Sequence, residues 1–162
     1  MANADTPNGL MPVGPVLRIQ EYEAGSAIYP GDPVALASDG QIDRSAGPAL
    51  IGVSLSYAAA AGDKVLVADD PNQLFEVQAD GSDIDAQTDM FQNYDIALGS
   101  ADTTYRKSTA ELDSDTASAT ATVALKLIRL LPRINNALGA NARCVVKLNN
   151  HQLAGGTGTA GV

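Results

Sequence analysis

The stretch LIGVSLSYAAAAGDKVLVADDPNQLFEVQADG, residues 50–81, contains three short apolar runs separated by turn residues. In the first run, every second residue is large and apolar, whereas small or polar residues stand between them. This alternation indicates β-strands, because successive side chains of a strand point to opposite faces of its sheet. We therefore predict three strands, within residues 50–57, 64–68 and 73–79.

Similar runs lie on both sides of this stretch, at residues 16–22, 33–37, 41–44, 123–131 and 143–149. Asp39-Gly40 separates two of them and is typical of a tight turn, because glycine readily adopts positive φ. The spacing leaves no room for the crossover helices that a parallel sheet requires. We predict an all-β fold, a small antiparallel β-barrel or a jelly-roll-like sandwich.

One short helix is expected within this β-rich chain. Residues 80–95 begin with acidic and small residues that can cap a helix, and acidic side chains are favourable at the positive end of the helix dipole. Apolar side chains then recur at nearly helical spacing, at Ile84, Met90, Phe91 and Tyr94. We predict a short α-helix between residues 80 and 95.

The two ends of the chain differ in composition from its middle. Residues 1–15 contain three prolines and predict an extended N-terminal arm, since proline disrupts both helices and central strands. The apolar side chains of the arm need a covering surface, and either a partner or the chain's own domain could supply it. We expect a single β-rich domain at residues 16–150 and a flexible, glycine-rich tail at residues 151–162.

Composition excludes several classes of function. The chain has 162 residues, with 19 acidic and 10 basic side chains and a formal net charge of −9. Such a charge repels a phosphate backbone, so we expect no nucleic-acid binding. No apolar run approaches the roughly 18 residues of a membrane-spanning helix, so we expect no membrane partner.

The side chains that usually carry catalysis are scarce. Cys144 is the single cysteine, and its alternation with Arg143 and Val145 predicts a small hydrophobic residue of the core. His151 is the single histidine, and it lies at the start of the glycine-rich tail without a partner at useful spacing. We therefore expect no catalytic residue and no enzymatic activity.

The acidic residues at 80–89 faintly resemble a calcium-binding loop. They fail its spacing, because the fifth loop position is Ile84 and the twelfth is Phe91. Solvated, helix-capping acids are the main interpretation, and a fortuitous surface cation site is the alternative. The glycines at 155–158 lack the lysine of a phosphate-binding loop. We expect no metal site and no cofactor.

Charge is divided unevenly along the chain. Residues 1–115 hold all 19 acidic side chains and five basic ones, a net of −14, whereas residues 116–162 hold five basic and no acidic ones, a net of +5. Either the basic side chains of residues 116–162 form ion pairs with acidic side chains of the earlier strands, or they form a positively charged surface for another copy of the chain or for a partner.

The segments GDPVALASDGQI (31–42) and 50–81 together carry a resemblance to a known family. The chain resembles the small β-rich decoration proteins of tailed bacteriophages, also called cement or head-stabilisation proteins. Their pattern combines GDPV and DG turns with IGV, GD-x-V-x-V and F-x-V strands, and it covers roughly residues 10–80 of this chain.

This resemblance implies a structural protein that is made in the host cytoplasm and then sits on the outer surface of an icosahedral capsid. It would bind the major capsid protein, usually as a homotrimer, and clamp neighbouring subunits. On this basis we expect the arm to contact the capsid through Leu10, Met11, Pro12 and Val13. The alternatives are a phage tail or baseplate component and a receptor- or carbohydrate-binding β-domain, although the latter usually has more aromatic residues.

Overall fold

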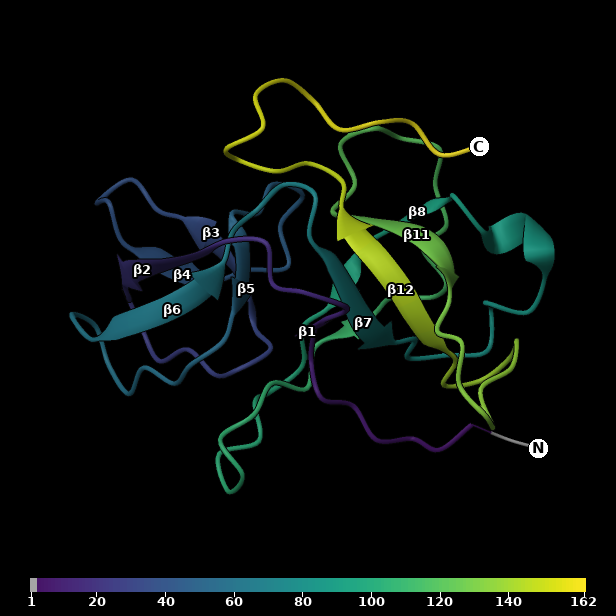
Figure 1. Cartoon of the computed structure of the whole chain (residues 1–162), viewed down its shortest axis with the longest axis horizontal. Coiled ribbons are helices and arrows are strands. Elements are labelled where there is room, and N and C mark those ends of the chain that lie inside the picture. The colour runs from purple at the N-terminus through teal and green to yellow at the C-terminus, as the bar shows by residue number, and fades with distance from the viewer. Residues whose placement is uncertain (1–2) are drawn as a thin grey trace.

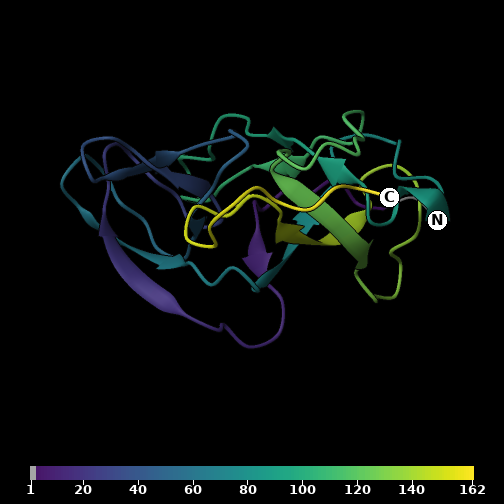
Figure 2. The same ribbon diagram turned by 90° about the horizontal axis from the view of Figure 1, so that it is seen from above.

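The computed structural model describes residues 3–162, so Met1 and Ala2 of the expected arm lie outside the described residues. The described chain forms two five-stranded sheets, a two-stranded sheet and one 3₁₀ turn. Figures 1 and 2 show an elongated molecule with one large sheet toward each end. Within residues 3–162, no helix is long and apolar enough to cross a membrane.

The first sheet comes from the first half of the chain and is antiparallel throughout. It curls so far that Ala24, which follows one edge strand, forms a bridge with Ile42 of the other edge strand. A small core of aliphatic side chains, including Val34, Val65 and Val67, fills the curl. The strand order is β2 (Ile19–Glu23), β6 (Lys64–Ala68), β5 (Gly52–Ser54), β3 (Pro33–Leu36) and β4 (Ile42–Arg44).

The second sheet combines the N-terminal arm with strands from residues 74–148, and its strands also pair antiparallel. Its order is β1 (Met11–Pro12), β7 (Leu74–Gln78), β12 (Arg143–Leu148), β11 (Leu125–Leu130) and β8 (Asn93–Tyr94). The two-stranded sheet pairs β9 (Ile96–Ala97) with β10 (Glu111–Leu112).

One large core lies on the inner face of the second sheet. Phe75, Val77, Cys144 and Val146 belong to it, together with Leu125 and Leu127 of β11. Leu50, Val53 and Ala68 from the first half of the chain belong to the same core, so hydrophobic packing joins the two sheets. Cys144 is fully buried there, which confirms its assignment as a core residue.

The all-β prediction is confirmed, and each predicted apolar run contains a strand. The α-helix predicted at residues 80–95 is wrong. The structure has only the 3₁₀ turn η1 (Gln87–Asp89) there, and Tyr94 lies in β8, which pairs with β11. Ile84, Met90 and Tyr94 are all buried in the large core, so an extended chain buries the residues whose spacing indicated a helix. Tertiary burial outweighs the local pattern here.

The C-terminal segment, expected to be a flexible tail, makes contacts with the domain. His151 is buried and bridges Leu50, so the histidine belongs to the folded body. Further along, the Thr159 amide donates to Asn149 Oδ1 at 3.1 Å, and Lys126 Nζ donates to the Ala160 carbonyl at 2.7 Å. Polar contacts therefore hold a segment whose side chains remain mostly exposed.

Candidate functional site

The N-terminal arm runs along the edge of the second sheet and crosses a loop of the first. The Val13 amide donates to the Leu74 carbonyl at 2.9 Å, and the Leu10 amide donates to the Gly31 carbonyl at 2.9 Å. Gly9 has φ +69°, and a Cβ there would lie 2.5 Å from the Gly31 carbonyl oxygen. Only glycine fits such a close backbone crossing without displacement. The arm is therefore fixed to both halves of the molecule.

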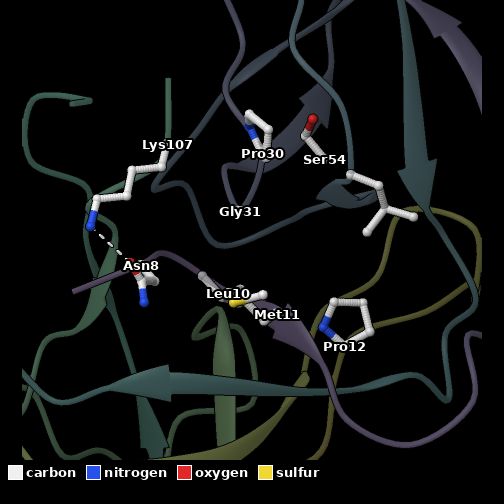
Figure 3. Close-up of a pocket in the computed structure, with 9 residues that line it drawn as sticks. Asn8, Leu10, Met11, Pro12, Pro30, Gly31, Ser54 and Lys107 are labelled. Carbon is white, nitrogen blue, oxygen red and sulfur yellow. Dashed lines mark hydrogen bonds between the residues drawn. The ribbon is translucent and has the colours of Figure 1, made fainter. Parts of the chain in front are cut away.

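A groove of about 340 Å³ opens beside this crossing. Figure 3 shows the arm residues along one side and the loops of the first sheet opposite them. Lys107 closes one end, where its Nζ donates to Asn8 Oδ1 at 2.8 Å and to the Pro7 carbonyl at 3.3 Å. The lining is otherwise largely apolar, and it comprises Asn8, Leu10, Met11, Pro12, Pro30, Gly31, Ser54, Leu55 and Lys107.

Aromatic side chains gather on the chain segments that form the groove. The rings of Tyr29 and Tyr57 pack with centroids 5.2 Å apart, and the Arg106 guanidinium lies 4.9 Å above the Tyr57 ring. Tyr105, the neighbour of Arg106, is 78% exposed. Tyrosine and arginine are enriched among the residues that dominate protein-binding energies. The groove and these side chains form a surface suited to contacting another macromolecule.

The expected contact residues divide into three groups in the structure. Leu10 is only 1% exposed, so its assignment as a partner contact is corrected to a core residue of the chain itself. Met11 is 50% exposed and Pro12 is half-buried, and both line the groove. Val13 is half-buried outside the groove lining. Met11 and Pro12 therefore remain the accessible contacts of the arm.

Several residues of this surface were missed by reading the sequence. Tyr29, Tyr57, Arg106 and Lys107 come from three segments that are distant along the chain. Each looks unremarkable in its own segment, so no local spacing indicates that they assemble. The GDPV motif, which carries part of the family resemblance, is the one sequence feature that points to this surface. Its first residue, Gly31, accepts the hydrogen bond from the arm at Leu10.

The single histidine and the single cysteine are both buried. Burial lowers the pKa of His151, and its Nδ1 accepts a hydrogen bond from the Leu153 amide at 3.1 Å. Burial raises the pKa of Cys144 to about 12, which keeps the thiol protonated and unreactive at neutral pH. His151 therefore packs beside Leu50 at the start of the C-terminal segment, and Cys144 packs in the large core.

Asp80, Asp95, Asp113 and Asp115 lie close to one another, and none of them lines the groove. Burial, a hydrogen bond to Asp115, and the charges of Asp80, Asp115 and Asp95 raise the pKa of Asp113 to about 6. Asp80 Oδ1 accepts hydrogen bonds from both the amide and the hydroxyl of Ser114. Among residues 3–162, no group of three or more His, Cys, Asp or Glu side chains is arranged to hold a metal ion.

Comparison with known proteins adds no assignment for this site. No protein-family model matches the chain, and no curated protein matches it either. The fold and the surface described above therefore carry the functional argument.

Proposed function

We propose that this chain is a structural protein of a phage particle, which binds the outside of the assembled capsid and clamps neighbouring major capsid subunits. The observation that carries the proposal is the groove beside the arm, with the exposed Met11 at its rim and the tyrosines and Arg106 next to it. The sequence resemblance over roughly residues 10–80 supports the choice of partner.

The geometry of the arm favours tight binding of this kind. Its backbone is already held by Leu74 and Gly31, so docking does not have to order a loose segment. A preordered surface retains more of its contact energy on association. When one protein makes several contacts with the same capsid, the high effective concentration of the later contacts raises the overall affinity. A protein that binds only the assembled capsid also stabilises the assembled capsid against dissociation.

The direct test mixes the purified protein with expanded capsids that lack decoration. We expect the protein to co-sediment with the capsids and to raise their melting temperature. Absence of both effects would show that the proposed class of function is wrong.

The proposed surface is tested separately with two matched substitutions. Met11→Asp places a charge at the rim of the groove, and Leu153→Asp places one on a C-terminal side chain of similar exposure, 47%. We expect Met11→Asp to weaken capsid binding at least about tenfold, while Leu153→Asp leaves it unchanged. If the wild type binds and Met11→Asp binds equally well, the function stands and the site is wrong.

Deletion of the whole arm is a poorer test of the same idea. Leu10 belongs to the large core, so removing residues 1–15 would damage the fold along with the contact surface. Point substitutions at the exposed arm positions separate these two effects.

A carbohydrate-binding domain is the second candidate, and one observation favours it. Tyr105, the chain neighbour of the Arg106 that stacks on Tyr57, is 78% exposed, and exposed aromatic side chains are common platforms for sugars. A glycan array tests this candidate. Binding to a defined glycan that disappears in Tyr105→Ala would favour the receptor-binding function over the capsid-binding one.

A further inference from the structure

Arg106 differs from the other arginines in the acidic part of the chain. Residues 1–115 hold all 19 acidic side chains, and Arg18 and Arg44 there each pair with a buried aspartate at 2.7 Å. Arg106 is exposed, and within the described residues its side chain neither pairs with a carboxylate nor donates a hydrogen bond. Its guanidinium lies 4.9 Å above the Tyr57 ring, which leaves the N–H groups available to a partner.

The backbone of Arg106 adopts a conformation that arginine rarely takes. Its φ is +51°, in the region that favours glycine. The residue closes a tight hairpin, in which the Asp102 amide donates to the Lys107 carbonyl at 2.9 Å and the Lys107 amide donates back at 3.1 Å. Asp102 Oδ1 also accepts from the amides of Thr104 and Tyr105, at 3.0 Å each. Glycine would suit this turn better, so the turn itself gives no reason for an arginine.

The hairpin is fixed to the end of the groove. The Ser108 amide donates to the carbonyl of Pro30, which lines the groove, at 2.9 Å. Figure 3 shows Lys107 and Asn8 at one end of the groove and Pro12 toward the other. Lys107 Nζ donates only to uncharged oxygens within residues 3–162. One end of a largely apolar groove therefore carries two neighbouring cations that lack a carboxylate.

We propose that the groove receives a protein segment in which an acidic side chain stands next to a large apolar one. The apolar side chain fills the groove between Met11 and Leu55, and the carboxylate meets Arg106 and Lys107. The inference deepens the proposed function and rests on it for the source of the segment, which is then the major capsid protein. The chemistry of the segment is argued from the groove alone.

Charge complementarity selects an acidic segment. Arginine binds a carboxylate through two parallel N–H groups, and such charge-assisted hydrogen bonds are stronger than neutral ones. A basic segment would instead be repelled by two adjacent cations. The net charge of −9 opposes any acidic partner at long range, but this repulsion is screened over about 10 Å at 0.1 M salt. A carboxylate in direct contact with Arg106 keeps its attraction.

The surroundings of the groove favour a protein partner over a small ligand. Met11 is 50% exposed at the rim, and Tyr105 is 78% exposed on the hairpin. A small ligand in the groove would leave these side chains uncovered, whereas a protein surface covers a ring of residues around a central anchor. The hairpin is already ordered by Asp102, so binding does not have to fix it.

The first test titrates the full chain with a capped peptide, Gly-Ser-Leu-Asp-Ser-Gly, and follows amide signals by NMR. We expect the signals of Met11, Leu55 and Lys107 to shift, and we expect no shift with a control peptide that has lysine in place of aspartate. Absence of any shift at about 5 mM of the first peptide overturns the inference, because even a weak specific contact is then detectable. Equal shifts with both peptides overturn it as well.

Two matched substitutions test the role of the charge. Arg106→Gln and Arg129→Gln each remove one positive charge from an exposed arginine that pairs with no carboxylate among residues 3–162. We expect Arg106→Gln to weaken binding of the aspartate peptide at least about tenfold and Arg129→Gln to change it less than about twofold. Equal losses in the two variants would show that Arg106 has no special part in binding.

Arg106→Gly separates binding from the shape of the hairpin. Glycine adopts the positive φ without strain, so we expect the amide signals of Thr104 and Lys107 to keep their positions while peptide binding falls as in Arg106→Gln. A glycine variant that binds the peptide like the wild type would mean that the arginine side chain is not used.

Competition on capsids distinguishes this inference from the proposed function. We expect the aspartate peptide, but not the lysine peptide, to displace the protein from expanded capsids that lack decoration. If the wild type binds the peptide and no capsids, the chemistry of the groove stands and the capsid function is wrong. If it binds capsids and the aspartate peptide does not compete, the capsid function stands and this inference is wrong.

Discussion

The two ends of the chain lie against the same domain but are held by different forces. The arm places Leu10 in the core and joins β7 through two paired residues of β1. The C-terminal segment after His151 places no side chain in the core and is attached through polar groups such as Asn149 and Lys126. Hydrophobic burial stabilises far more per residue than exposed hydrogen bonds do. The comparison shows that glycine and proline content alone does not distinguish a structural strap from a peripheral segment.

Leu10→Ala should have the largest effect. It removes a side chain that is 1% exposed and leaves a cavity between the arm and the large core, so the free energy of unfolding should fall by about 2–5 kcal/mol. Chemical denaturation measures this loss. Met11→Ala, the half-exposed neighbour, serves as the control and should cost less than about 1 kcal/mol. Equal effects of the two substitutions would contradict the distinction between them.

Gly9→Ala should have the next largest effect. A Cβ at Gly9 would lie 2.5 Å from both the Gly31 carbonyl oxygen and the Ser108 Cβ, and the residue has φ +69°. We expect a loss of about 1–3 kcal/mol in the free energy of unfolding. Gly14→Ala is a matched control, because Gly14 has φ +74° with no atom near its missing Cβ. The difference between the variants measures the crowding at the crossing, and identical losses would show that backbone strain alone matters.

Removal of residues 155–162 should have a smaller effect than either change in the arm. The truncation loses the hydrogen bonds that Asn93 and Lys126 donate to this segment and the one that Asn149 accepts from the Thr159 amide, all of which involve exposed residues of the segment. We expect the free energy of unfolding to fall by about 1 kcal/mol or less. Limited proteolysis should also cleave within this exposed segment before it cleaves the arm. A loss as large as that of Leu10→Ala would show that the C-terminal segment contributes as much to stability as the arm does, against this comparison.

Lowering the pH should reduce the free energy of unfolding by a still smaller amount, through protonation of His151 at the start of the C-terminal segment. Burial lowers the pKa of His151 below its ordinary value of 6.5, so between that value and the folded-state pKa the unfolded chain binds more protons. Stability contributed by neutral His151 is thus present above pH 6.5 and is lost as pH falls below it. Asp69 and Asp70 oppose this shift, while the charge of Arg18 adds to it.

The measurement compares unfolding free energies at pH 7.5 and 5.5 for the wild type and His151→Gln. We expect the wild type to lose more stability than the variant over this interval, since glutamine does not titrate there. The opposite order would mean that His151 gains a stabilising charge on folding.

The strands were predictable because their signal is local. Alternation within residues 64–68 and 73–79 reflects one buried and one outward face. The first run is a strand over its whole expected length, and the second is a strand from Leu74 to Gln78. The helix at residues 80–95 failed because Ile84, Met90 and Tyr94 reach the same core by an irregular path. Helical spacing and a winding extended segment can bury the same residues, and only the surrounding sheet decides between them.

The candidate site was predictable only in part. The arm and its exposed Met11 follow from prolines and apolar residues in one segment. The partners of the arm depend on where the loops at Gly31 and Lys107 come to rest, which is a property of the tertiary fold. The burial of Leu10 and His151 likewise depends on surfaces that lie far away in the sequence.

The burial of Cys144 has a practical consequence for labelling the protein. Its side chain is fully enclosed and its thiol stays protonated, so maleimide reagents at neutral pH should leave it untouched. A cysteine introduced at an exposed position, such as Ala4 in the arm or Thr157 near the C-terminus, would then be the sole labelled group. Fluorescent reporters can thus be placed on either end of the native sequence without first replacing its own cysteine.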